Sequence, residues 1–219
     1  MNRRTLVLGV AAVAVAGFGG ATYFVTGNTK SEAVAAVAED TPLIRPYSPI
    51  FGPADAPVTI VEFFDPACEA CRAFHPIVKQ IMEAFPGKVR VVLRYAAFHP
   101  PSAKAITILE TARLQNLFEP VLEALFAAQP RWAPHGRDPA SAWDVAAKAG
   151  LNVGRARDDA KTPDIVAVLN QDAADVTTVG VSQTPTFFVN GKPLTDFGAQ
   201  QLFDLVESEV EATRDIPRD

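Results

Sequence analysis

The chain has 219 residues, is 48% hydrophobic and has a formal net charge of −5. This length and apolar content suffice for one substantial core, so we expect one domain with extensions. An acidic chain without a cluster of lysine and arginine argues against nucleic acid as a partner. The two cysteines lie three positions apart, which indicates one working redox pair rather than a structural disulfide framework.

The N-terminal segment combines a basic start with a long apolar run. Arg3 and Arg4 precede residues 6–25, which carry no charge and as a helix would reach about 30 Å, the thickness of a bilayer core. Residues 1–28 are therefore interpreted as a membrane anchor or as a signal peptide, with a small-residue cleavage site such as 36–38. The arginine pair also resembles a twin-arginine signal. Either interpretation places the rest of the chain on the periplasmic or cell-envelope side, where disulfides persist, with residues 6–25 in the inner membrane if uncleaved.

Residues 29–46 contain Ala-Val repeats, charges and prolines, and we interpret them as a linker, with a short helix over 32–38 as the alternative. The folded domain is expected over residues 47–213. Residues 214–219 are expected to form a frayed tail.

The cysteine pair lies where an apolar strand gives way to a helix. Residues 58–64 predict a strand buried on both faces, which Asp65 and Pro66 interrupt, and the apolar residues that follow recur at helical spacing. Cys68 is therefore expected in the first helical turn, where free backbone N–H groups and the helix dipole stabilise a thiolate. The thiolate is the nucleophile of disulfide exchange. Cys71, one turn on, could attack the mixed disulfide that Cys68 would form.

Glu62 is a carboxylate inside this otherwise apolar strand, six residues before Cys68. Burial would raise its pKa and prepare it to exchange protons with the thiols. Alternatively, Glu62 is a structural partner of an arginine on the neighbouring strand, for which Arg90 and Arg94 are candidates. The two roles do not exclude each other.

A strand–helix–strand unit follows from the next segments. Pro76 is expected to bend the helix, and Pro86-Gly87 to end it. Residues 89–95 predict a second strand, which should run parallel to the first through a right-handed crossover.

Residues from about 101 to 176 predict a helical insertion between two parts of the sheet. Pro120 is expected to break or kink the first part of this insertion. Asp138-Pro139 and Thr162-Pro163 each have the pattern of an N-cap followed by proline at the first helical position, and Gly150 should stop the helix that begins at the first of these.

Strand character returns in residues 179–194, where Asn190-Gly191 between apolar runs predicts a tight hairpin turn. Pro185 precedes the apolar run, and the low frequency of cis bonds before proline gives no reason by itself to expect one there. Residues 198–212 predict a final amphipathic helix.

Four parts of the chain together resemble the thioredoxin superfamily and, within it, the DsbA-like thiol:disulfide oxidoreductases. They are residues 52–65, the pair Cys68 and Cys71, the helical Pro76, and residues 180–191. The helical insertion favours the DsbA-like branch, because plain thioredoxins lack it. The resemblance implies an α/β, thioredoxin-like fold with an inserted helical domain, and no cofactor beyond the redox-active Cys68–Cys71 disulfide.

The resemblance also implies roles for single residues. Cys68 would be the attacking, more exposed cysteine and Cys71 the resolving one. Pro185 would be cis and lie against the pair, and Thr184 would offer backbone hydrogen bonds to an extended substrate. Glu62 falls where the family has its buried acid.

The sequence departs from the strongest oxidases of this family at two places. Glu69 and Ala70 separate the cysteines, where strong oxidases have proline and histidine. A histidine there would stabilise the Cys68 thiolate, and a glutamate should do the opposite, so we expect a milder redox pair. Thr184 resembles the isomerases and reductases more than the oxidases, which more often have valine.

These features predict an exported thiol:disulfide oxidoreductase that introduces disulfides into periplasmic proteins, with an isomerase or reductase using the same cysteines as the alternative. Expected partners are cysteine-containing exported proteins and a membrane redox partner, either a DsbB-like oxidase or a DsbD-like reductant. A monomer is expected, because the linker is too short for the dimerisation domain of the isomerases.

A different class of function is metal binding. Cys68, Cys71 and His75 could give three copper or zinc ligands on one helix face. A closed zinc site would need a fourth ligand, for which His99 is the nearest candidate. The preferred interpretation has no metal.

Overall fold

The computed structural model describes residues 39–136 and 138–213. The predicted anchor or signal, the first part of the linker and the C-terminal tail lie outside these residues. Within them, no helix combines the length and apolar character needed to cross a bilayer.

A five-stranded sheet in the order β1-β3-β2-β4-β5 forms the centre of the fold. Its strands are β1 (Ile50–Phe51), β2 (Val58–Phe64), β3 (Val89–Tyr95), β4 (Thr186–Val189) and β5 (Lys192–Pro193). β2 and β3 are parallel, as predicted, and the other neighbours are antiparallel. β1 was not predicted from the sequence, because its two residues are too few to give a periodic signal.

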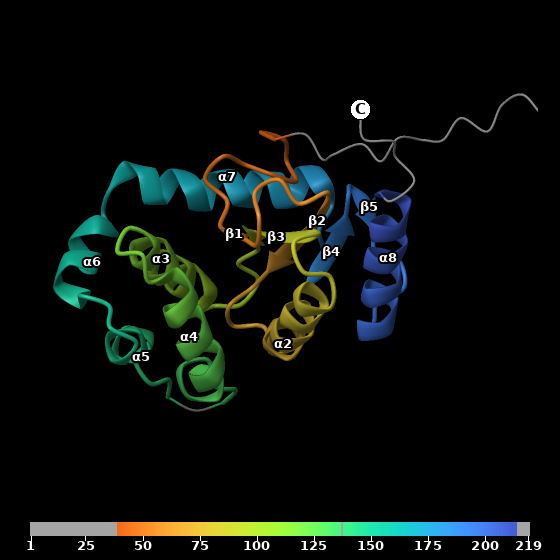
Figure 1. The fold of residues 1–219 in the computed structure, drawn as a ribbon. Coiled ribbons are helices and arrows are strands. Elements are labelled where there is room, and N and C mark those ends of the chain that lie inside the picture. The colour runs from red at the N-terminus through yellow and green to blue at the C-terminus, as the bar shows by residue number, and fades with distance from the viewer. Residues whose placement is uncertain (1–38, 137, 214–219) are drawn as a thin grey trace, which may run out of the picture. The chain divides into compact units, whose positions relative to one another are not determined.

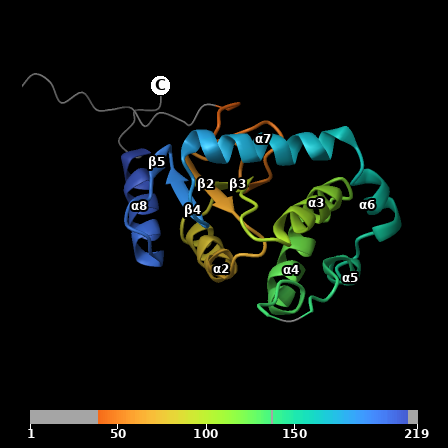
Figure 2. The same cartoon turned by 180° about the vertical axis from the view of Figure 1, so that it is seen from behind.

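The two faces of the sheet are covered by different helices. Alternate residues of β2, including Ile60 and Phe64, face the core beneath α2 (Glu69–Ala84) and α8 (Ala199–Ala212), while Val61 and Phe63 face α7 (Pro163–Val179). Figures 1 and 2 show α7 on one side of the sheet and α2 on the other. All seven residues of β2 are buried, and the helices on both faces explain why its sequence is mostly apolar.

The helical insertion joins β3 to β4. It consists of α3 (Ser102–Arg113), α4 (Phe118–Trp132), α5 (Ala142–Lys148), α6 (Val153–Asp159) and α7. Helices α3 to α6 gather beside the sheet, away from α8 (Figure 2). α4 runs close to the start of α2, and this contact brings the insertion to the cysteine pair.

Two predictions of helix boundaries within the insertion are wrong. The chain leaves the helix after Arg113, and Pro120 lies in the first turn of α4, where its missing N–H breaks no helical hydrogen bond. α5 begins after Ser141, not at Asp138-Pro139, because the backbone N–H of Ala140 bonds back to α4. Thr162-Pro163 does begin α7, as predicted.

The end of the sheet follows the prediction. Asn190 and Gly191 have φ angles of 48° and 80°, so both central residues of the β4–β5 hairpin adopt the left-handed conformation that a tight turn requires. The hairpin keeps β4 in register with β2, and α8 then covers the sheet beside α2.

A buried ion-pair network fixes α7 to the sheet. The Arg94 guanidinium on β3 lies 2.6 Å from Asp172 and 2.7 Å from Asp175, and Arg45 binds Asp175 from the surface side at 2.7 Å. Although burial opposes ionisation, these arginines lower the pKa of Asp175 to about 2.

Candidate active site

The two cysteines occupy different environments at the start of α2. Cys68 is the N-cap residue of this helix, one position earlier than expected, and Cys71 lies in its first turn. Cys68 retains 8% of its surface and Cys71 none. Both are free thiols, so the structure represents the reduced form.

Hydrogen bonding makes Cys68 the more acidic thiol. Its pKa is lowered to about 5, chiefly by a hydrogen bond from Cys71, and further by the Thr184 side chain and the backbone amides of Ala70 and Cys71, although burial acts in the opposite direction. Burial instead raises the pKa of Cys71, whose hydrogen bond to the Cys68 thiolate adds to this effect. Near neutral pH, the pair therefore consists of a thiolate that keeps a small exposed fraction and a thiol that is fully buried.

A loop far away in sequence completes the surroundings of Cys68. The Thr184–Pro185 peptide bond is cis, as the resemblance implies, and Cys68 Sγ lies 3.2 Å from the Thr184 carbonyl oxygen. The antiparallel pairing of β4 with β2 brings this loop to the cysteines. On its far side lies a groove of about 370 Å³ with Pro185 and Phe197 in its walls.

Glu62 is buried beneath the cysteines and is not the partner of an arginine. It lies opposite Leu93 in the sheet, and the arginines of β3 point to the other face. Arg90 binds the Thr59 hydroxyl and Arg94 binds the aspartates of α7, so the interpretation of Glu62 as a structural partner for either arginine is wrong. Burial, and secondarily the Cys68 charge, raises the pKa of Glu62 to about 8.

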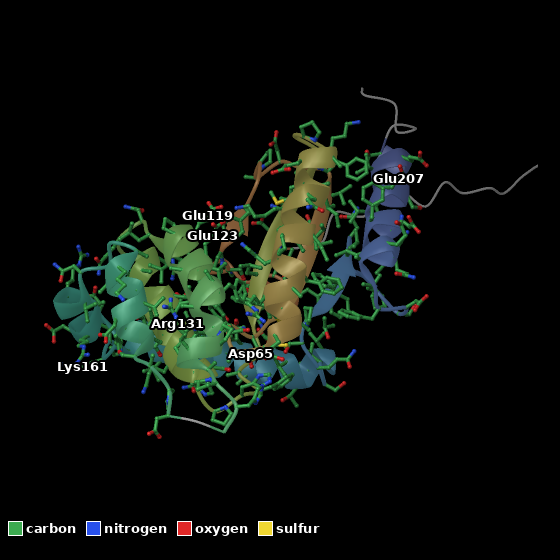
Figure 3. The ribbon with its side chains drawn as sticks, turned by 90° about the horizontal axis from the view of Figure 1, so that it is seen from below. Asp65, Glu119, Glu123, Arg131, Lys161 and Glu207 are labelled. Carbon is green, nitrogen blue, oxygen red and sulfur yellow. The ribbon has the colours of Figure 1, made fainter. Side chains whose placement is uncertain are left out.

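A cavity connects Glu62 with the outside. It measures about 300 Å³ and lies between α2, β1 and β3, with Glu62 and Leu93 in its walls together with Lys79 and Glu119. Figure 3 shows Glu119 and Glu123 on the side of α4 that faces α2, where Lys79 contacts both. Glu62 therefore borders a cavity whose walls also carry the charged side chains of Lys79 and Glu119.

Asp65 organises the loop before Cys68, although from the sequence it was expected only to interrupt the strand. Its fully buried carboxylate accepts hydrogen bonds from the N–H groups of Ala67 (2.8 Å), Phe98 (2.8 Å) and His99 (3.1 Å), from the Ser102 hydroxyl, and from the His99 ring at 2.8 Å. Its own N–H lies 3.4 Å from Cys71 Sγ. Figure 3 shows Asp65 close to a sulfur atom at one end of α2. The feature of the sequence that could have indicated this role is the position of a carboxylate directly after a buried strand.

The insertion supports the same loop through Gln129, which the sequence analysis also missed. From α4, its side-chain amide donates to the carbonyl oxygens of Pro66 and Cys68, at 2.9 Å each. Two carbonyl groups beside the reactive sulfur are thereby satisfied without water.

The arrangement of the described residues does not support the metal interpretation. His75 turns toward α4, with its ring 5.2 Å from that of Phe126 and its Nε2 atom 3.8 Å from Glu123. His99 binds Asp65 instead. Among the residues that the structure describes, no three histidine, cysteine or acidic side chains are gathered as metal ligands.

Comparison with known proteins agrees with this geometry. Residues 45–207 match the protein family described as Thioredoxin. The Na⁺/H⁺ antiporter NhaA of Herminiimonas arsenicoxydans is 30% identical over 166 residues, which make up 75% of this chain and 26% of that protein. The chain thus spans about a quarter of the length of the curated relatives it matches.

Several solved structures share the fold. Oxidised BdbD from Bacillus subtilis has a TM-score of 0.67 at 24% identity, covering 75% of this chain and 93% of its own. A thioredoxin-like oxidoreductase from Silicibacter pomeroyi has a TM-score of 0.64 at 24% identity, covering 87% and 100%. The catalytic domain of Proteus mirabilis ScsC has a TM-score of 0.59 at 21% identity, covering 75% and 89%. These similarities confirm the predicted α/β fold with its helical insertion.

Proposed function

Because the chain belongs to the thioredoxin family, we propose that it is a thiol:disulfide oxidoreductase acting through Cys68 and Cys71. The observation that carries this proposal is the difference between the two thiols. The pKa of Cys68 is lowered to about 5 in a partly accessible position, whereas Cys71 is buried and its pKa is raised. One ionised, reachable sulfur with a protonated thiol in contact is the arrangement that disulfide exchange requires.

In the oxidising direction, a substrate thiolate attacks Cys68 Sγ of the Cys68–Cys71 disulfide. The S–S bond breaks, Cys71 Sγ leaves as a thiolate, and a mixed disulfide joins the substrate to Cys68. A second substrate thiolate then attacks the substrate sulfur and releases Cys68 as a thiolate. The substrate loses two electrons and gains a disulfide, while the cysteine pair gains both electrons.

Glu62 supplies the proton that Cys71 takes up in this reaction. With its pKa raised to about 8, Glu62 is neutral at pH 7 and can protonate the leaving Cys71 thiolate. The adjoining cavity lets Glu62 recover its proton from solvent without exposing the sulfurs. In the reducing direction, Glu62 would accept the proton from Cys71.

We assign the oxidising direction as the physiological one. A stabilised Cys68 thiolate favours the reduced pair and makes its disulfide oxidising. A thiol pKa of about 5 lies between the values of about 7 for thioredoxin and about 3.5 for DsbA, so we expect an oxidant of intermediate strength. Thr184 favours the second candidate, an isomerase or reductase. A threonine before this proline resembles the isomerases and reductases of the family, whereas the oxidases more often have valine there.

Equilibration with glutathione buffers tests the direction. We expect a reduction potential between about −270 mV, as in thioredoxin, and about −120 mV, as in DsbA. A potential at the thioredoxin end would favour a reductase, and one at the DsbA end would contradict the milder pair that Glu69 and Ala70 predict.

Disulfide transfer tests the activity itself. Oxidised protein mixed with a reduced peptide that contains two cysteines should lose its disulfide as the peptide gains one. Cys68→Ser should abolish the transfer. In the reverse reaction, the Cys68 thiolate of Cys71→Ser should attack the disulfide of the oxidised peptide, release one peptide cysteine as a thiolate and accumulate a mixed disulfide, because no second protein thiol resolves it. A fully active Cys71→Ser protein would contradict the mechanism.

We further propose that the protein works on exported proteins at the periplasmic side, and that a membrane partner re-oxidises its cysteines. The apolar run at residues 6–25 and the redox pair support this location. Because an oxidase keeps this pair as a disulfide, intact cells are first treated with a membrane-impermeant phosphine reductant, after which a membrane-impermeant thiol reagent should label Cys68. Labelling only after lysis would place the protein in the cytoplasm.

A further inference from the structure

The Asp65–His99 pair lies beside the reactive cysteine and has no part in the mechanism described so far. Asp65 is fully buried, and His99 Nδ1 lies 2.8 Å from its Oδ2 atom. The other Asp65 carboxylate oxygen accepts the N–H of Ala67, the residue before Cys68, at 2.8 Å. A single carboxylate therefore ties the imidazole to the loop that carries the reactive sulfur.

This contact fixes the orientation of the imidazole. The other partners of the Asp65 carboxylate are all hydrogen-bond donors, and a carboxylate accepts, so we assign His99 Nδ1 as a donor too. In the neutral ring, Nε2 then carries the free lone pair. About 40% of the side-chain surface of His99 is exposed, so this side of the ring can meet another molecule.

A groove of about 460 Å³ shows what His99 can meet. Ala67 and His99 line it together, and Pro100, Pro101 and Trp132 give it mostly apolar walls. The other titratable group that lines this groove is His135, which lies 3.8 Å from Glu69. Asp65 does not line the groove and contacts His99 directly. Ala67 directly precedes Cys68 in the chain, so a polypeptide bound in this groove would lie beside the residue that carries the reactive sulfur.

We propose that His99 takes the proton of the substrate thiol, so that the substrate reaches Cys68 as a thiolate paired with an imidazolium. The inference rests on the proposed function and adds a catalytic residue to it. The substrate S–H bond breaks, and its proton moves to His99 Nε2. The thiolate then attacks Cys68 Sγ, and Cys71 Sγ leaves with the electron pair of the broken S–S bond. In the reverse direction, the imidazolium returns the proton to the departing substrate thiolate.

The ionised fraction of the substrate thiol limits how much His99 can raise the rate of disulfide exchange. A peptide thiol with a pKa of about 8.5 is roughly 3% ionised at pH 7, so full ionisation could speed its attack by at most about 30-fold. Near pH 9.5 nearly all of the thiol is ionised by solvent, and His99 has nothing left to contribute. A thiol that is already ionised at pH 7 gains nothing at any pH.

His99→Asn separates proton transfer from positioning. The Asn amide can still donate to Asp65 in place of Nδ1, but it has no basic nitrogen in place of Nε2. The measurement is the second-order rate at which a reduced single-cysteine peptide opens the Cys68–Cys71 disulfide. We expect His99→Asn to be 5- to 30-fold slower than the wild type at about pH 7 and within twofold of it at about pH 9.5.

An aromatic thiol that is fully ionised at pH 7, such as thionitrobenzoate, is the matched control. The variant should react with it at the wild-type rate at both pH values. Equal losses of rate with both thiols at both pH values would show that His99 has a purely structural role and would overturn the proposal. The absence of any loss of rate would also overturn it. Asp65→Asn should reproduce the pH-dependent loss, because it frees the imidazole to turn; comparison of its unfolding curve with that of the wild type accounts for any loss of folded protein.

The outcome for the wild type separates this inference from the proposed function. If the wild-type disulfide exchanged with neither thiol, the proposed function itself would fail. If the wild type exchanged with both and His99→Asn matched it with the peptide at about pH 7, only the role of His99 would be refuted.

Discussion

Cys68 Sγ lies 3.2 Å from the carbonyl oxygen of Thr184, although the two residues are 116 positions apart in the chain. The antiparallel pairing of β4 with β2 brings them together, since Phe63 and Thr186 are opposite each other in the sheet. The reactive thiol and the cis-proline loop therefore lie at the same edge of the sheet. In the mechanism proposed above, a substrate bound at Cys68 also contacts this loop, and Glu62 supplies a proton from the cavity that it lines.

The low pKa of Cys68 should depend on Cys71. The hydrogen bond from Cys71 is the largest of the effects that bring the Cys68 pKa to about 5. Cys71→Ala removes this donor, so we expect the Cys68 pKa to rise toward the ordinary thiol value of about 8.5. The pH dependence of the alkylation rate by iodoacetamide measures this pKa. Unchanged alkylation of Cys71→Ala would show that the helix N-terminus, and not the second thiol, stabilises the thiolate.

Glu62→Gln should make the protein more stable and slower. The folded-state pKa of Glu62 is raised from 4.5 to about 8, so between these pH values the folded chain binds more protons than the unfolded chain and stability falls as the pH rises. Glutamine has no proton to lose, so above about pH 8 the variant should be more stable by about 4 kcal/mol.

Urea unfolding of the wild type and Glu62→Gln at pH 4 and pH 9 measures this difference, which should be small at pH 4. Disulfide exchange should slow at neutral pH, since Cys71 loses its proton donor. A variant that gains no stability at pH 9 would show that water in the adjoining cavity solvates the ionised carboxylate.

Several elements could be predicted from residue types and spacing alone. β2 and β3 are mostly apolar, Thr162-Pro163 marks the start of α7, and Asn190-Gly191 marks the hairpin. Each of these signals is local and each has a specific backbone geometry. The start of α5 was predicted at Asp138, but Ser141 caps this helix. The hydrogen bond from the Ala140 N–H back to α4 explains why the helix begins at the later residue.

The site was predictable only in part, for a physical reason. A cysteine pair at a strand–helix junction indicates its own chemistry, and a carboxylate in an apolar strand indicates burial. The orientation of Arg90 and Arg94 depends on strand register, since a shift of one residue would move them to the face of Glu62. Apart from Ala67, the partners of Asp65 lie 33 to 37 positions away, in a segment that only the tertiary fold brings to this carboxylate.

Gln129→Met should weaken the loop that carries Cys68. Methionine has nearly the same size but no donor, so the Pro66 carbonyl oxygen loses its bond from Gln129 and the Cys68 carbonyl oxygen keeps only the Arg72 N–H. We expect a loss of about 2 kcal/mol in unfolding free energy, together with faster amide exchange in residues 65–72. Gln200→Met on α8 is the matched control, because Gln200 is exposed and should change stability by less than about 0.5 kcal/mol. Equal effects of the two substitutions would refute the supporting role of Gln129.

Asp175→Asn should destabilise the protein at neutral pH but not in acid. The folded-state pKa of Asp175 is lowered from 3.8 to about 2, so its contribution is present above pH 3.8 and is lost as the pH falls toward 2. The variant leaves Arg45 without its buried carboxylate and Arg94 with Asp172 alone, and we expect a loss of about 3 kcal/mol at pH 7. Urea unfolding should show that the loss of stability in Asp175→Asn is smaller at pH 2 than at pH 7.

Asp158→Asn is the control, because its exposed pair with Lys161 should contribute less than about 1 kcal/mol at either pH. A loss at pH 2 as large as that at pH 7 would mean that the shape of the Asp175 side chain, rather than its charge, holds α7 against the sheet.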